Sequence, residues 1–164
     1  MSDLKVRTIR LEPMRVACVR AVSETPERDA WEKLRTWASS NGLLDDFEKH
    51  PVFGFNNPNP SPDRKVYGYE FWIRVDPCVE SEGEIEIKEF TGGLYAVAKC
   101  KLQGDPSGSV VEVWRKLWDW VQASDKHRWR RTHELEQCQD PQAAEEDIVL
   151  DLYLPIEERA ESPG

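Results

Sequence analysis

The sequence lacks the features that identify several large classes of protein. None of the apolar runs in its 164 residues approaches the roughly 20 residues that a membrane span needs. The first residues, MSDLKVRTIRLEP, also lack the apolar core of a signal peptide. We therefore expect a cytoplasmic protein that has no membrane partner.

Metal-binding and phosphate-binding motifs are missing as well. The four cysteines and three histidines are scattered, and no CxxC pair or Cys/His ligand spacing occurs. There is no phosphate-cradling glycine loop and no GxSxG motif. We expect reduced thiols, no metal site and no cofactor.

The charge is strongly one-sided. Lysine and arginine number 22 against 31 acidic residues, which gives a net charge of −9 and a pI of about 4.9. Nucleic-acid phosphates select a basic face, so we expect no direct nucleic-acid binding, whereas cationic partners suit this balance. The basic run HRWRR at 127–131 is better explained as the solvated start of a strand.

Two segments, 26–42 and 109–124, have apolar residues at helical spacing. The two predicted helices resemble each other, because AWEKLRTW (30–37) aligns with VWRKLWDW (113–120). We assign the tryptophans that this alignment matches to the cores between helix and sheet: Trp31, Trp37, Trp114 and Trp120.

The segments around the helices repeat too. Before each helix come two apolar runs joined by a short turn, LEPM or FTGGL, and each pair predicts an antiparallel hairpin. After each helix comes another strand pair. KVYGYEFWIRV corresponds to DIVLDLYLPI, which places Tyr69-Glu70 opposite Leu150-Asp151. The chain is therefore predicted to be a tandem β-β-α-β-β repeat.

Neither half can bury its helix alone, so we predict one α+β domain over residues 1–164. It has a long antiparallel sheet, two helices on one face and a ligand groove at the pseudo-two-fold between the halves. The half-repeats span about 4–76 and 84–156, followed by a flexible tail at 157–164. The Pro/Asn loop at 56–65 is expected beside the groove.

Several stretches together carry a family resemblance that covers nearly the whole chain, although each is weak alone. The stretches are FGFNNP (53–58), YGYEFWI (67–73), IKEFTGGLYAV (87–97), VWRKLWDW (113–120), LEQC (135–138) and DLYLPI (151–156). With them, the sequence resembles the GyrI-like, or effector-binding, family of small-molecule-binding domains, a SOUL-like duplicated β-β-α-β-β fold, in its stand-alone form.

The resemblance implies a hydrophobic groove lined by aromatic rings, with a glutamate in its floor. In transcription activators such a domain follows a helix-turn-helix module, which we expect to be absent here. It implies a bacterial protein that takes up lipophilic, in some cases cationic, compounds. One alternative is a hydrolase that detoxifies cyclopropanoid or other electrophilic compounds, and another is an interaction protein that modulates DNA gyrase. Oligomeric state is left open.

The family glutamate falls on Glu136, and a one-residue slip makes Glu134 the substitute. The family tyrosine falls on Tyr69, with Tyr67 as the alternative on the same face of the strand. In a hydrolase, Glu136 would orient the attacking water and the Tyr69 hydroxyl would position it or stabilise the developing oxyanion. Against this stands the ordinary expectation that a strand glutamate faces solvent.

The remaining candidates for the groove wall are aromatic. They are Phe55, Trp72, Trp129 and Tyr153. A carboxylate among such rings can neutralise a cationic ligand, with cation–π contacts adding to the attraction. Strand alternation puts Trp72 and Tyr69 on opposite faces, so only one of them can line the groove in a regular strand. The sequence leaves the choice of face open.

Overall fold

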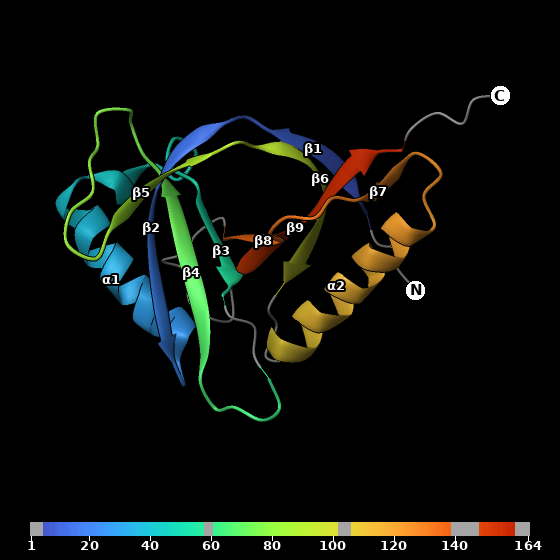
Figure 1. Cartoon of the computed structure of the whole chain (residues 1–164), viewed down its shortest axis with the longest axis horizontal. Helices are drawn as coiled ribbons and strands as arrows, with labels where there is room; N and C mark the ends of the chain where they lie inside the picture. Colours follow the sequence, from blue (N-terminus) through green and yellow to red (C-terminus); the bar gives the residue numbers. More distant parts are fainter. Residues whose placement is uncertain (1–4, 58–60, 102–105, 139–147, 160–164) are drawn as a thin grey trace. The chain divides into compact units, whose positions relative to one another are not determined.

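The computed structural model describes residues 5–57, 61–101, 106–138 and 148–159. The chain divides into two compact units. We call residues 13–91 the N-terminal unit, and residues 1–12 together with 92–164 the C-terminal unit. Each unit contains one long helix packed on antiparallel strands (Figure 1).

In the N-terminal unit the strands run in the order β3-β4-β2-β5, and all neighbours are antiparallel. Helix α1 packs against β2 and β4. The elements are β2 (Met14–Ser23), α1 (Pro26–Ser40), the 3-10 helix η1 (Leu43–Asp45), β3 (Val52–Asn56), β4 (Tyr67–Arg74) and β5 (Glu86–Phe90).

In the C-terminal unit the order is β1-β6-β9-β8, with β7 pairing to β9, and helix α2 packs against β6 and β9. The two units confirm the predicted α+β class with antiparallel strands and two helices. The elements are β1 (Arg7–Leu11), β6 (Gly93–Lys101), α2 (Pro106–Gln122), β7 (His127–Trp129), β8 (Leu135–Cys138) and β9 (Val149–Glu158).

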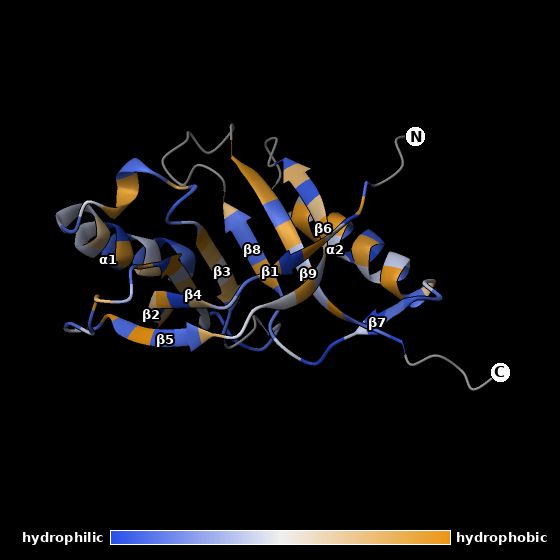
Figure 2. Ribbon diagram, turned by 90° about the horizontal axis from the view of Figure 1, so that it is seen from above, coloured by the Kyte–Doolittle hydropathy of each residue, from blue (hydrophilic) through white to orange (hydrophobic). Residues whose placement is uncertain are grey.

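The helices form where the apolar spacing predicts them, and each buries one stripe. Pro26 suits the first turn of α1 because its missing N–H has no intrahelical partner there. Leu34 of α1 and Leu117 of α2, which the repeat aligns, are both fully buried in their cores. Figure 2 shows the corresponding pattern on strands such as β5 and β8, where hydrophilic and hydrophobic residues follow one another along the ribbon.

One of the four tryptophans is misassigned by the sequence. Trp31 and Trp37 pack on the core under α1, and Trp114 packs on the core under α2. Trp120, by contrast, is 37% exposed, and its ring stacks on His127 at 6.5 Å between centroids. Its core assignment is wrong because the buried stripe of α2 runs through Leu117 and Val121, which the position of Trp120 does not share.

The predicted hairpins are also wrong. Strand β1 pairs with β6 instead of β2, and β5 pairs with β2 instead of β6. Only two residues join the strands in each case, and a two-residue hairpin turn needs a positive φ at its first central residue. Those residues are Glu12 and Thr91, and no non-glycine residue in the described part of the chain has a positive φ. Each first strand therefore continues past its neighbour and pairs elsewhere.

Gly92 provides a test of how closely the segment between β5 and β6 approaches the segment between β1 and β2. Its φ is +75°, and an added Cβ would lie 2.1 Å from the carbonyl oxygen of Leu11 and 2.9 Å from the carbonyl carbon of Glu12. We expect Gly92→Ala to lower the free energy of unfolding by about 2–4 kcal/mol in urea titrations, because both the conformation and the space exclude a side chain.

Gly83 is the matched control for this variant. Its φ is +58°, but nothing lies within 4 Å of the added Cβ. Gly83→Ala should therefore cost only the conformational part, about 1–2 kcal/mol. Equal losses in the two variants would show that the close approach of Gly92 to Leu11 does not contribute.

Tyr67 connects β4 to α1, since its hydroxyl donates to the Glu27 carboxylate at 2.6 Å and 2.9 Å. Burial, and after it the hydrogen bond and charge of Glu27, raise the pKa of Tyr67 to about 12. An unfolded tyrosine titrates near pH 10, so this contribution is fully present below about pH 10 and is lost as the pH rises through about 12.

We therefore expect Tyr67→Phe to reduce the slope of stability against pH in that alkaline window. Urea unfolding of wild type and variant at several pH values measures the slope. The other tyrosines titrate in both proteins, so the difference isolates Tyr67. Parallel curves for the two proteins would contradict the assigned role of the Glu27 contact.

Candidate aromatic carboxylate site

Strand β4 has two chemically different faces. Tyr67 bonds to α1, and Ile73 lies in the core under α1, so these alternate residues face the helix. Glu70 and Trp72 therefore point to the opposite face. A glutamate that is only 3% exposed is unusual on any face and requires partners.

Aromatic rings surround this glutamate. Phe55 of β3 lies opposite Glu70 in the strand register, and its ring packs edge-on against Trp72 at 5.0 Å between centroids. Phe90 of β5 reaches the same tryptophan at 5.1 Å. The face opposite α1 therefore places one buried carboxylate beside a cluster of three rings.

Three hydrogen-bond donors satisfy the Glu70 carboxylate. Trp72 Nε1 donates to Oε2 at 2.6 Å, Lys88 Nζ approaches the same oxygen at 3.1 Å, and Asn57 Nδ2 donates to Oε1 at 3.4 Å. The Lys88 side chain is 44% exposed. The buried negative charge is thus paired with a cation whose other side meets solvent.

The charges at this site affect its neighbours. Burial lowers the pKa of Lys88, but the hydrogen bond and charge of Glu70 outweigh it, so the pKa is raised overall. On β2, Cys18 lies opposite Trp72, and burial raises the pKa of its thiol to about 11 despite the nearby Lys88 ammonium. The thiol is therefore protonated at neutral pH and is not an activated nucleophile.

The C-terminal unit has a counterpart at the repeat-related position. Asp151 of β9 is buried, and the Arg7 guanidinium of β1 bonds to it at 3.3 Å. Two residues further on, the Tyr153 hydroxyl donates to Gln137 Oε1 at 2.7 Å. Burial, and after it the charge of Asp151, raise the pKa of Tyr153 to about 12, so its hydroxyl stays protonated.

Glu136, the glutamate assigned from the sequence, lies on the other face of its sheet. It is opposite Leu152 in the β8–β9 register, and Leu152 belongs to the core under α2. Gln137 therefore shares the face of Tyr153, whereas Glu136 is on the side of α2. Glu134 precedes β8 and is exposed, and partial desolvation raises the pKa of its carboxyl.

The assigned tyrosines lie on the α1 side of β4. The Tyr69 ring covers Gly54, where an added Cβ would lie 2.4 Å from the tyrosine oxygen, and it packs against Phe71 at 4.8 Å. Tyr67 is bonded to α1 as described above. Trp72 and Phe55 therefore lie on the face away from α1, and which of the two faces lines a ligand groove stays a prediction. Tyr69 and Glu136 belong to different units, and their pairing in catalysis stays a prediction.

Trp129, another assigned groove residue, lies in β7. Its ring packs on the core under α2 and meets Trp118 edge-on at 5.7 Å. In the described part of the N-terminal unit, Phe55 and Trp72 are members of the aromatic set that the structure brings together. Part of the Pro/Asn loop, residues 58–60, lies outside the described residues, as does part of the tail, 160–164.

Sequence reasoning missed Glu70, although a signal was present. The strand YGYEFWI is apolar or aromatic except for this residue, and the repeat places another acid, Asp151, at the corresponding position. An acidic residue that recurs in the buried strand of both halves points to a paired buried charge.

Within the described ranges, no group of three His, Cys, Asp or Glu side chains could hold a metal ion. In the same part of the chain, neither helix combines the length and apolar character that crossing a membrane requires.

A duplicated β-β-α-β-β chain with a buried acid and aromatic rings on the strand face away from each helix is a ligand-binding type of architecture. The GyrI-like small-molecule-binding domain family matches residues 4–157, and the chain belongs to this family. A comparison with curated proteins finds no match.

Solved structures share the fold at low sequence identity. EcmrR in its complex with DNA matches with a TM-score of 0.68 and 14% identity, over 94% of this chain and 58% of EcmrR. A hydrolase from Listeria innocua matches with 0.68 and 14%, over 96% and 94% of the two chains. SAV2435 bound to tetraphenylphosphonium matches with 0.59 and 11%, over 94% of each chain. At these identities the likeness concerns the fold alone.

The Glu70–Lys88 pair yields a stability prediction. Lys88→Met leaves the buried carboxylate without its cation, and we expect a loss of about 1–3 kcal/mol near pH 7 by urea unfolding. The loss arises because Glu70 is buried and Lys88 is the one cation that bonds to it among the contacts described above.

Two variants serve as controls. Lys88→Arg keeps the positive charge and should retain most of the stability. The double variant Glu70→Gln with Lys88→Met removes both charges and should lose less than Lys88→Met alone. An equal loss in the double variant and in Lys88→Met would show that the methylene chain of Lys88, and not its charge, stabilises the fold.

Proposed function

We propose that this chain binds lipophilic cations at the aromatic carboxylate site, the cluster formed by Glu70, Lys88, Phe55, Trp72 and Phe90. The observation that carries the proposal is a buried carboxylate held beside aromatic rings on the face of β4 that points away from α1. Aromatic faces attract cations, and a carboxylate supplies the opposite charge.

In the protein without ligand, the Lys88 ammonium occupies the place beside Glu70 that a ligand cation would take. Its ammonium group bonds to Glu70, and its exposed side chain can swing into solvent when a ligand cation takes its place. Trp72 Nε1 would continue to donate its hydrogen bond to Glu70 Oε2, the same oxygen that Lys88 releases. Binding is thus an exchange of one cation for another, which limits the cost of the buried charge in both states.

The family supports a small-molecule ligand, and the relative SAV2435 is described as bound to tetraphenylphosphonium. That compound combines four aromatic rings with a delocalised positive charge, which is the chemistry that the aromatic carboxylate site favours. It is therefore the probe of choice for this chain.

Tetraphenylphosphonium titrated into the protein should quench or shift tryptophan fluorescence in a saturable way. Glu70→Gln should weaken binding by roughly tenfold or more, because loss of one charge contact costs on the order of 1.5–3 kcal/mol. Lys88→Met should tighten binding, because it removes the competing cation. The two variants therefore change affinity in opposite directions.

Glu136→Gln is the matched control, since it removes a carboxylate from the other unit. If this variant weakens binding and Glu70→Gln does not, the family glutamate assigned from the sequence is the counter-ion and the Glu70 proposal fails. Mass spectrometry of neutral electrophiles incubated with wild type and Glu136→Gln tests the hydrolase alternative. A water adduct formed only by wild type would establish turnover that depends on Glu136.

A further inference from the structure

A groove lies on the N-terminal unit, away from Glu70. It has a volume of about 890 Å³ and runs between α1, the last residues of β2 and the chain that precedes β5. Residues that represent its three sides are Arg20 and Val22 of β2, Lys33 and Trp37 of α1, and Glu82 and Glu84 of the segment before β5.

One side of this groove is an unpaired strand edge. Strand β2 pairs with β4 over Val16–Ser23, but with β5 only over Met14–Cys18. The last five residues of β2 therefore have a strand neighbour on one side only, within the part of the chain that the structure describes. An unpaired edge is a template for an added strand.

The register shows which main-chain groups face the groove. Val75 N–H donates to the Arg15 carbonyl at 2.9 Å, on the side of β2 where β4 lies. Main-chain groups alternate between the two sides along a strand, so those of odd-numbered residues face β4. The N–H and C=O groups of Arg20 and Val22 therefore face the open edge. The Val22 side chain is also 51% exposed.

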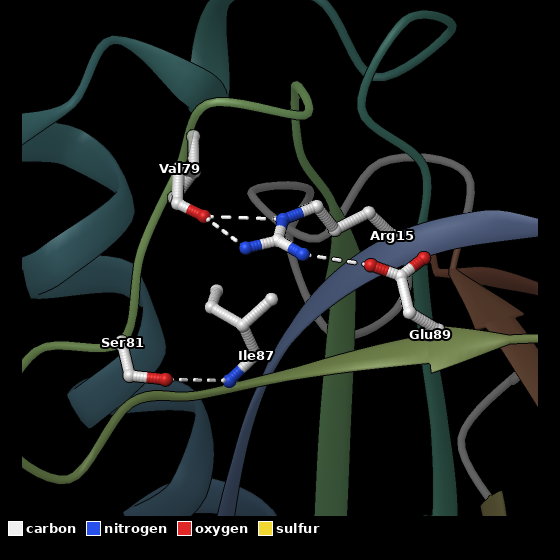
Figure 3. Close-up of polar contacts among 5 residues, drawn as sticks. All are labelled: Arg15, Val79, Ser81, Ile87 and Glu89. Carbon is white, nitrogen blue, oxygen red and sulfur yellow. Dashed lines mark hydrogen bonds and ion pairs between the residues drawn. The ribbon is translucent and has the colours of Figure 1, made fainter.

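The chain before β5 is fixed in a position that leaves this edge open. The Arg15 guanidinium donates to the Val79 carbonyl through Nε at 3.1 Å and Nη2 at 2.7 Å, and to Glu89 through Nη1 at 2.7 Å (Figure 3). Ile87 N–H donates to Ser81 Oγ at 3.1 Å in the same view. The segment is thus held where it loops away from β2.

The same segment is also attached to α1. Trp37 Nε1 donates to Glu82 at 3.2 Å, and Lys33 pairs with Glu84 at 3.3 Å. These contacts make the loop a wall of the groove. Because the wall is bonded to the helix, β5 cannot simply extend along β2 to fill the open position.

We propose that the groove binds an extended peptide segment of a partner protein, carrying basic side chains, as a strand added to β2 at residues 19–23. Five strand residues span roughly 17 Å, which suits a short linear segment. Charge selects the partner: four of the lining residues are acidic, Asp29, Glu32, Glu82 and Glu84, against two basic ones, Arg20 and Lys33. The net charge of the whole chain, −9, favours the same partner.

The test uses the full chain labelled with ¹⁵N and a blocked peptide of about six residues that alternates lysine and valine. We expect saturable amide shifts that are largest at Arg20 and Val22, with slower hydrogen exchange at both. The same peptide with all its main-chain amides N-methylated cannot donate to the edge and should bind at least roughly fivefold more weakly.

Variants of the chain separate main-chain pairing from charge. Val22→Pro removes one outward N–H at an edge position and should weaken binding roughly fivefold or more, whereas Val22→Thr keeps the N–H and should not. Glu82→Gln removes a charge but retains an acceptor for Trp37, and should weaken binding most at low salt. If Val22→Pro does not fold, Glu82→Gln and the methylated peptide decide.

Three results would overturn the proposal. Absence of saturable binding is the first, and equal affinity of the methylated peptide, which indicates charge attraction alone, is the second. The third is self-association of the chain, seen by sedimentation, that shifts the Arg20 and Val22 amides without peptide. In that case the occupant of the edge is a second copy of the chain.

Discussion

Both buried acids depend on one feature of the strand pairing: the first strand of each half-repeat, β1 or β5, pairs outside the hairpin predicted for it. Strand β1 pairs with β6, and β5 pairs with β2, so each first strand leaves the hairpin that its sequence suggests. Each then supplies the cation of a buried acid: Arg7 of β1 bonds to Asp151, and Lys88 of β5 bonds to Glu70. With ordinary hairpins each of these cations would belong to the other unit, and both carboxylates would need different partners.

The chemistry of the aromatic carboxylate site follows from that pairing. A buried glutamate beside three rings would be costly alone, and Lys88 makes it tolerable in the unliganded protein. Under the proposed function, a ligand would have to displace Lys88 from this ion pair, and only a cation could do so without leaving the carboxylate unpaired. Selectivity for cations would then follow from the contact that stabilises the folded protein.

Strand β4 pairs with β2 as far as Ser23, whereas β5 pairs with it only as far as Cys18, and this difference has a second consequence. Strand β5 covers the first part of β2 and then departs, because Arg15, Trp37 and Lys33 hold the preceding segment against other groups. The unit thus has two candidate recognition surfaces with different chemistry. One is the ring-lined face around Glu70, and the other is an acidic groove beside open main-chain groups.

Much of the architecture could be predicted from the sequence. The helical spacing of Leu34 and Leu117 reflects interactions within a few residues, and so does the alternation along the strands. The repeat was visible for the same reason, since both halves bury equivalent positions. Within the site, Phe55 and Trp72 were identified as groove candidates, whereas Glu70 was overlooked and Glu136 was preferred. The lack of a positive φ at Glu12 and Thr91 also shows why the hairpin prediction failed.

The sequence by itself determined the helices, the period of the strands and the family, because these depend on local order along the chain. Only the tertiary structure decided which strands pair, and therefore which cation meets Glu70 and on which face Glu136 lies. The physical reason is that a strand presents the same main-chain groups to any partner, so its choice depends on register and packing across residues far apart in sequence.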